Sequence, residues 1–360
     1  MPKSFTEHEV IERIEDMRKR RPTFADDHIT MSHGAGGKAT RQLVEGLIVP
    51  ALANPALEAL GDAALLDADG VGLAFTTDAF VVRPLRFPGG SIGELAVNGT
   101  INDLAVMGAR PLGLSAALIL EEGLAAATLE AEIAAMSAAA VRAGVSIVTG
   151  DTKVVERGKA DGMYITTTGI GTVASGVTLS PGQVRAGDRV VVSGTIGDHG
   201  IAIMLARGQL DIAADVRSDT RELWSLASRL LEVCGEELRC MRDATRGGVA
   251  TVLNEIAMTS GLGVVIAEDR LPILPAVAGA GEILGIDPLY VANEGKLVAF
   301  IGPDVVDEAV AALRALPGGE DATVIGEVRE EPPGRVLGRT TFGGHRMIDM
   351  LVGDPLPRIC

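Results

Sequence analysis

The chain has 360 residues, a length that predicts about two domains with ample core. Its 48 acidic residues outnumber its 32 basic ones, for a formal charge of −16, so it lacks the basic surface with which proteins bind nucleic-acid backbones. Three cysteines are too few for a disulfide framework, and no apolar stretch is long enough to span a membrane, so we expect a cytoplasmic protein.

The first half of the chain alternates short apolar strands with Ala-rich helices, a pattern typical of α/β and α+β folds. Residues 1–29 precede this pattern as an N-terminal extension, within which residues 5–21 are compatible with a short polar helix. The elements predicted for this half are strands at residues 71–77, 112–120, 145–149 and 163–173 and helices at residues 91–107 and 124–143.

Turn residues at 181–182 and 187–188 place a domain boundary near residue 178. We therefore predict an N-terminal domain at 30–177 and a C-terminal domain at 178–345. A flexible tail is expected at 346–360, because two prolines and a glycine near its end oppose regular structure. The elements predicted for the second half are strands at residues 189–193, 262–267 and 296–301 and helices at residues 198–206, 219–233, 247–260 and 304–315.

The segment HGAGGK, at residues 33–38, is the first candidate for a ligand site. Glycine permits positive φ angles and close approach, so Gly34, Gly36 and Gly37 would let backbone N–H groups face an anion. The loop departs from the P-loop pattern, because Ser32 and Ala39 stand where glycine and Ser or Thr are required. An ordinary glycine-rich turn is the alternative interpretation.

Four aspartates follow or end apolar runs. Carboxylates in such settings require a hydrogen-bond donor or a cation, and Mg²⁺ is commonly held by one or two carboxylates together with phosphates. The pattern therefore favours an ATP·Mg²⁺ site, although each aspartate alone also suits a turn or a helix cap. Asn98 and Asn102 are four residues apart on one face of the predicted helix at 91–107. The four aspartates are Asp62, Asp78, Asp103 and Asp151.

Further candidates lie in the second half. Asp243 and Arg246 precede a Gly-Gly turn that leads into a helix, which suits an anion site or a capped helix start with a surface ion pair. Glu294, in the segment ANEGK, has the context of a turn before an apolar strand. Cys234 and Cys240 are interpreted as ordinary thiols, because their spacing does not match that of zinc ligands.

In chain order, the segments LGDAA, TTDAFVVRPLRFPGG, IGELAVNGTINDLAVMGARP, VTGDTKVV, DATRGG and ANEGK resemble the aminoimidazole ribonucleotide synthetase (PurM-like) superfamily of ATP-using enzymes. Within it, residues 30–360 are similar to the carbamoyl dehydratase family of [NiFe]-hydrogenase maturation, in which a C-terminal cysteine, here Cys360 of the closing PRIC, undergoes the chemistry. The resemblance implies a two-domain α/β fold and a homodimer whose N-terminal domains form an intersubunit β-barrel near the ATP sites.

The resemblance also implies roles for the candidate residues. Three glycines would lie over the triphosphate, the four aspartates would hold Mg²⁺ and phosphate, and two asparagines and Asp243 would line the same cleft. Cys360 would be the nucleophile. The candidates for the base that removes the N–H protons are Glu294, Lys153 and His33, and we favour Glu294 and Lys153 as participants. The glycines are Gly34, Gly36 and Gly37, and the asparagines are Asn98 and Asn102.

The chemistry implied by the resemblance begins with a carbamoyltransferase partner, HypF, which places a carbamoyl group on Cys360. Phosphorylation from ATP then makes the carboxamide oxygen a good leaving group, and loss of phosphate and the N–H protons leaves an S-cyanide. A HypC–HypD scaffold complex would receive the cyanide for the iron site of the hydrogenase.

Two alternatives remain open. One is another ATP enzyme of the superfamily, such as a thiamine-monophosphate kinase, a selenophosphate synthetase or the purine-pathway cyclase. A selenophosphate synthetase is expected to have cysteine or selenocysteine near the glycine loop, where Ser32 and His33 stand. The other alternative is a non-catalytic carrier that displays Cys360.

Overall fold

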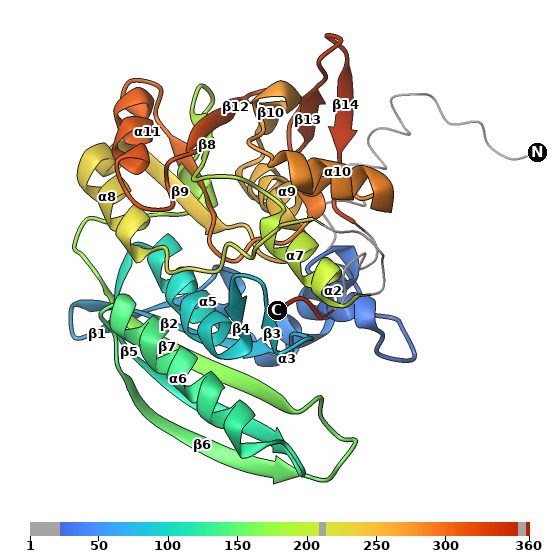
Figure 1. The fold of residues 1–360 in the computed structure, drawn as a ribbon. Coiled ribbons are helices and arrows are strands. Elements are labelled where there is room, and N and C mark those ends of the chain that lie inside the picture. The colour runs from blue at the N-terminus through green and yellow to red at the C-terminus, as the bar shows by residue number, and fades with distance from the viewer. Residues whose placement is uncertain (1–21, 209–213, 352–357) are drawn as a thin grey trace, which may run out of the picture.

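The computed structural model describes residues 22–208, 214–351 and 358–360, and two β-sheets organise them (Figure 1). The N-terminal sheet has five strands in the order β1-β2-β7-β5-β6, in which only β5 and β6 are parallel neighbours. Its strands are β1 (Ala64–Ala68), β2 (Val71–Phe80), β5 (Ala109–Glu121), β6 (Ile147–Val155) and β7 (Met163–Val173).

The helix α5 (Ile92–Val106) covers one face of this sheet and is almost entirely buried, because it contacts three central strands on one side and further helices on the other. The helix α6 (Ala126–Arg142) packs alongside α5 (Figure 1). On the opposite face, apolar side chains remain between 37% and 47% exposed, and strand register places them on one side of the sheet. These side chains are Leu66, Phe75, Ile119 and Ile170.

The C-terminal sheet has seven strands in the order β14-β13-β10-β12-β8-β11-β9, and only β10 and β13 are parallel neighbours. Its inner strands are apolar and buried on both faces, because helices pack on each side. The strands are β8 (Arg189–Val192), β9 (Leu238–Asp243), β10 (Gly263–Ala267), β11 (Leu297–Ile301), β12 (Thr323–Arg329), β13 (Val336–Arg339) and β14 (His345–Ile348).

Helix α9 (Gly248–Ser260) packs on one face of the seven-stranded sheet, while α8 (Trp224–Cys234) and α11 (Val306–Arg314) pack on the other. Helices α7 (Asp198–Ala206) and α10 (Pro275–Leu284) lie where the two sheets meet (Figure 1). The shorter elements are α2 (Lys38–Leu43), a π-helical turn (Val44–Ile48), α3 (Val49–Leu52), α4 (Pro55–Glu58), the hairpin of β3 (Arg86–Phe87) and β4 (Gly90–Ser91), and 3-10 turns at Met31–Gly34, Pro181–Gln183, Gly235–Glu237, Glu268–Arg270 and Pro288–Tyr290.

The predicted two-domain α/β architecture is confirmed, and α7 has the predicted bounds. The helix predicted at 219–233 begins only at Trp224, because Thr220 and Leu223 before it are hydrogen-bonded to Asn98 and Asn102 of the N-terminal domain. Strand β6 continues well past residue 149, to Val155. Residues 5–21 lie outside the described part of the chain, and no helix in the described part is long and apolar enough to cross a membrane.

The prediction of a flexible tail from residue 346 needs correction at both ends. Residues 346–348 belong to β14, which pairs with β13. Ile359 and Cys360 are 5% and 6% exposed, so the end of the predicted tail is buried. Local composition cannot reveal this docking contact with a distant segment of the chain.

Candidate active site

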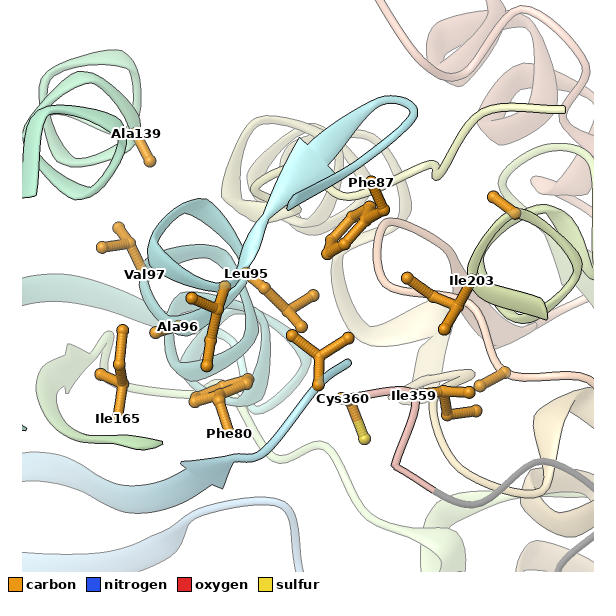
Figure 2. Close-up of a cluster of buried hydrophobic side chains, with 14 of the residues drawn as sticks. Phe80, Phe87, Leu95, Ala96, Val97, Ala139, Ile165, Ile203, Ile359 and Cys360 are labelled. Atoms are coloured by element: carbon orange, nitrogen blue, oxygen red, sulfur yellow. The ribbon is translucent and has the colours of Figure 1, made fainter. Parts of the chain in front are cut away.

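Cys360 lies in the interior of the molecule, where the two domains meet. Figure 2 shows Cys360 and Ile359 beside Phe80 and Leu95 of the N-terminal domain and Ile203 of α7. The N–H of Val81 donates to the carbonyl of Cys360 at 3.0 Å, and the N–H of Arg83 donates to the carbonyl of Arg358 at 3.3 Å. The two segments run in opposite directions, and these two bonds dock residues 358–360 against residues 81–83.

Arg246, from the turn before α9, contacts the sulfur. Its Nη1 donates to Cys360 Sγ at 3.0 Å. Burial nevertheless raises the pKa of the Cys360 thiol to about 12, with Arg246 opposing the shift and the carboxylate of Glu294 adding to it. At neutral pH the docked cysteine is therefore a thiol rather than a thiolate.

Glu294 is close enough to Cys360 to affect its titration and is itself only 2% exposed. Burial, and then the charges of Asp243 and Asp219, hold the pKa of Glu294 well above its usual range, while Arg246 opposes the shift. Its Oε1 is buried without a hydrogen-bond partner among the described residues. A carboxyl group with a raised pKa and a free oxygen suits proton transfer beside the sulfur.

Three of the four predicted metal-site aspartates cluster, and Asp243 joins them. Burial raises the pKa of each, and interactions within the cluster raise those of Asp78, Asp103 and Asp243 further. Arg242 forms an ion pair with Asp62, and Thr76 Oγ1 donates to Asp103 Oδ2 at 2.6 Å. The group comes together because Asp78 lies on β2, Asp103 on α5 and Asp243 at the end of β9.

This cluster fits a cation that is shared with phosphates. Asp62 Oδ2 is buried without a hydrogen-bond partner in the described structure. The carboxylates also repel one another, so the positively charged side chains nearby do not fully balance their negative charge. Within residues 22–208, 214–351 and 358–360, no three His, Cys, Asp or Glu side chains are arranged to hold an ion by themselves. Mg²⁺ ordinarily needs only one or two carboxylates when phosphates and waters complete its shell.

Asp151 and Lys153 are not part of the cluster within one protomer. They form an ion pair with each other at 2.9 Å, with side chains 64% and 71% exposed. Both lie inside β6, opposite Ala117 and Ile119 of β5, and therefore on the sheet face that α5 leaves open.

His33 has both ring nitrogens engaged. Its Nδ1 accepts from the Thr30 N–H at 2.9 Å, so Nε2 carries the proton and donates to Asp26 Oδ2 at 2.9 Å. Phe24 packs edge-on against the ring. These contacts hold the start of the glycine loop in place and leave no ring nitrogen open to a substrate.

The glycine loop lines a cavity of about 280 Å³ that also reaches Cys360 and Arg246. Gly36 has φ +79°, and a Cβ there would lie 2.8 Å from Arg246 Cβ. A Cβ on Gly37 would lie 2.4 Å from the Leu351 carbonyl oxygen. Glycine is therefore required for this loop to pack against the Arg246 turn, and both loops border one cavity beside the sulfur, with Gly34 in its lining.

Asn98 and Asn102 join the two domains. The Asn102 amide donates to the carbonyls of Arg221 and Glu294 at 3.0 and 3.2 Å, and its Oδ1 accepts from the Leu223 N–H at 2.8 Å. Asn98 Nδ2 donates to Thr220 Oγ1 at 3.2 Å. The two amides hold the segment before α8 and the backbone of Glu294, rather than projecting into the open cavity.

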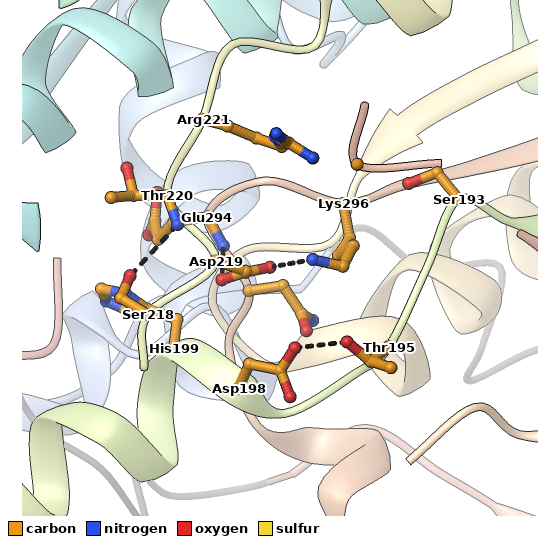
Figure 3. Close-up of polar contacts among 12 residues, drawn as sticks. Ser193, Thr195, Asp198, His199, Ser218, Asp219, Thr220, Arg221, Glu294 and Lys296 are labelled. Atoms are coloured by element: carbon orange, nitrogen blue, oxygen red, sulfur yellow. Dashed lines mark hydrogen bonds and ion pairs between the residues drawn. The ribbon is translucent and has the colours of Figure 1, made fainter. Parts of the chain in front are cut away.

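The sequence did not predict a buried polar network next to Glu294, formed by Asp219, Lys296, His199 and Ser218 (Figure 3). Burial opposes ionisation of Asp219, but Lys296, at 3.1 Å, and the Glu294 N–H hold its pKa below its usual value. Asp219 Oδ1 accepts from the Glu294 N–H at 3.0 Å, and Ser218 Oγ lies 2.8 Å from His199 Nδ1. The segment ANEGK contains two of these residues, but its context resembled an ordinary turn.

Comparisons with known proteins agree with this architecture. Residues 60–173 match the N-terminal domain, and residues 185–338 the C-terminal domain, of AIR synthase related proteins. The fold and site thus define an AIR synthase-related protein. At 19% identity and a TM-score of 0.63, a solved thiamine monophosphate kinase from Aquifex aeolicus shares the fold alone.

The carbamoyl dehydratase HypE of Rhodobacter capsulatus is 51% identical over 338 residues, which are 93% of this chain and 99% of the relative. The HypE of Escherichia coli K12 is 45% identical, over 93% of this chain and 100% of its own. The chain belongs to the HypE family of carbamoyl dehydratases. A solved HypE in complex with ATP has a TM-score of 0.78 and 44% identity, covering 92% of this chain and 100% of its own. A HypE–HypF complex has a TM-score of 0.82 and 44% identity, covering 86% and 99%.

Proposed function

We propose that this protein dehydrates an S-carbamoyl group carried on Cys360 to an S-cyanide, at the expense of ATP, for the iron site of [NiFe]-hydrogenase. The observation that carries this proposal is the docking of Cys360 against Arg246, beside a cavity bordered by the glycine loop. A buried sulfur next to a ligand-sized cavity suits chemistry on a group attached to the sulfur.

The residues around Cys360 support a division of roles. The carbamoyl group has one oxygen and two N–H protons to lose, and phosphorylation of that oxygen supplies a leaving group. Glu294 takes one N–H proton at its unpartnered Oε1, and the phosphate leaves with the carbamoyl oxygen and the second N–H proton as the C≡N bond forms. Arg246 stabilises negative charge that develops beside the sulfur.

ATP and Mg²⁺ are proposed to bind where the glycine loop, the Arg246 turn and the carboxylate cluster meet. The N–H groups at Gly34, Gly36 and Gly37 would receive phosphates, and Asp62, Asp78, Asp103 and Asp243 would hold the metal and its ligands. The solved HypE in complex with ATP supports ATP as the ligand. A bound Mg²⁺ would supply positive charge to neutralise the transferring phosphoryl group.

We also propose that the chain forms a homodimer through the open face of the five-stranded sheet, giving an intersubunit β-barrel. That face carries the exposed apolar side chains of Phe75 and Ile170, which lie directly opposite each other. Asp151 and Lys153 share the face, so pairing would take them toward the partner subunit's site. The domain division near residue 178 remains a prediction.

HypF is proposed as the carbamoyl donor, in line with the solved HypE–HypF complex. A HypC–HypD complex is proposed as the acceptor of the cyanide. Because each partner must reach the sulfur of Cys360, the docked tail has to leave its site between steps.

The decisive experiment weighs the C-terminal peptide after incubation with carbamoyl phosphate, ATP, Mg²⁺ and HypF. We expect a carbamoyl group on Cys360, followed by ATP-dependent loss of one water. A Cys360→Ala variant that still formed a free product from ATP at the full rate would contradict the proposal. Carbamoyl loading without dehydration, despite ATP binding, would favour the carrier.

A further inference from the structure

The docked residues 358–360 are held from two sides. On one side, the backbone of Val81 and Arg83 donates to carbonyls of the tail. On the other side, His199 Nε2 lies 2.6 Å from the Ile359 carbonyl, and Arg207 Nη2 donates to the Arg358 carbonyl at 2.7 Å. His199 is in the first turn of α7 and Arg207 follows its last residue, so side chains from the two ends of this helix contact two consecutive tail carbonyls.

The donor state of His199 follows from its partners. A carbonyl oxygen only accepts hydrogen bonds, so Nε2 must carry the proton. Nδ1 then accepts from the Ser218 hydroxyl at 2.8 Å. His199 is fully buried, and burial keeps its pKa below the usual value, so the ring remains neutral in this arrangement. Ser218 is itself anchored, because its N–H donates to the Pro88 carbonyl at 2.8 Å.

Arg207 connects the tail to residues 81–83, against which the tail docks. Its Nε donates to the Arg83 carbonyl at 3.0 Å, while its Nη2 contacts the Arg358 carbonyl. A planar guanidinium presents both donors in fixed geometry, which a lysine ammonium does not reproduce. The contacts from both His199 and Arg207 go to the tail backbone, so they leave the Cys360 side chain free.

We propose that His199 and Arg207 of the α7 region hold the tail in its docked position, and we call this pair the latch. The pair sets the balance between docked and undocked Cys360. They act as positioning residues, because they hold the carbonyls next to Cys360 without contacting its sulfur. The inference rests on the proposed function, in which loading needs an accessible sulfur and dehydration needs a docked one. Weakening the latch therefore slows dehydration of a loaded tail but does not slow its loading by HypF.

The first test uses the full chain alone, without ATP or partner, and measures alkylation of Cys360 by iodoacetamide from the mass of the C-terminal peptide. His199→Leu and Arg207→Met should each raise the rate about tenfold, the factor that corresponds to loss of one hydrogen bond of about 1.4 kcal/mol. His199→Gln, which retains a donor near the position of Nε2, should stay close to the wild-type rate. His345→Gln and Arg229→Met, at exposed sites away from the tail, are matched controls.

An unchanged rate of Cys360 alkylation in both His199→Leu and Arg207→Met would contradict the proposal that these two residues hold the tail. Arg207 is only partly buried, so its variant keeps the test decisive if the buried His199→Leu protein does not fold. The second test compares loading and dehydration rates in the same variants. Faster alkylation with an unchanged dehydration rate would overturn the positioning role. A wild-type protein that never dehydrates its loaded cysteine contradicts the proposed function, whereas the alkylation result still decides the latch.

Discussion

Arg246 Nη1 lies 3.0 Å from the sulfur of Cys360, and the same guanidinium moderates the titration of Asp78 and Glu294. One cation therefore faces the reacting sulfur, a candidate base and a candidate metal ligand. Its position follows from the close approach of the Arg246 turn to the glycine loop, which Gly36 permits.

Replacement of Arg246 should slow the dehydration step. Arg246→Met removes the charge beside Cys360, and we expect the cyanation rate at saturating ATP to fall about tenfold or more, on the scale of a charged hydrogen bond. Arg246→Lys should recover only part of the rate, because it keeps the charge without the fork geometry. Time courses of the Cys360 peptide mass measure both. A wild-type rate in Arg246→Met would remove Arg246 from the site.

Tail docking should weaken at high pH. Burial raises the pKa of docked Cys360 to about 12, above an ordinary value of 9.0, so the docked state favours the thiol. This contribution to docking is fully present below the undocked pKa and is lost as pH rises from about 9 toward 12. The Cys360 alkylation rate should therefore keep rising above pH 9, where that of a free tail peptide levels off. A parallel pH profile for the two would contradict this expectation.

Asp78→Asn should weaken Mg²⁺-dependent ATP binding without unfolding the protein. The change removes one charge from a cluster of mutually repelling carboxylates, so the free energy of unfolding should stay constant or rise. Calorimetric titration with ATP, with and without Mg²⁺, measures the effect, and Asp304→Asn at an exposed site is the control. Unchanged binding would exclude Asp78 from the metal site.

Asn102→Ala should act mainly on stability. The substitution leaves the Leu223 N–H and the Arg221 carbonyl without partners, and it removes one of two donors to the Glu294 carbonyl, at a cost of about 3 kcal/mol. Asn54→Ala, which removes an exposed helix cap, should cost only about 1 kcal/mol. Urea unfolding of both variants gives the comparison. A stable Asn102→Ala protein with weakened ATP binding would instead favour a ligand contact.

Mixing of variants can locate the site at which Lys153 acts. Lys153→Ala and Glu294→Gln should each abolish dehydration as homodimers. If Lys153 serves the partner's site, one site of each mixed dimer regains both side chains, and random mixing restores about one quarter of the sites. Recovery of no activity would place Lys153 in its own subunit's site, whereas an active Lys153→Ala homodimer would place it outside both sites. The loaded Cys360 peptide again provides the measurement.

The sequence predicted most of the acidic cluster, because Asp62, Asp78 and Asp103 each stand out from an apolar context. It did not predict that Asp151 and Lys153 would be separated from them, since the length of β6 depends on pairing with β5. His199 and Arg207 were missed although the bounds of α7 were predicted correctly. Their partners lie at the far end of the chain, and no local pattern encodes that contact.

The hydrogen bonds between the tail and residues 81–83 also fix the position of the sulfur. A slip of the tail by one residue would move Cys360 away from Arg246 and bring its neighbour there instead. Because the carbonyls of Arg358, Ile359 and Cys360 are all engaged, such a slip would also break contacts on both sides at once. The spacing between these contacts and the sulfur therefore belongs to the active site as fully as any side chain in it.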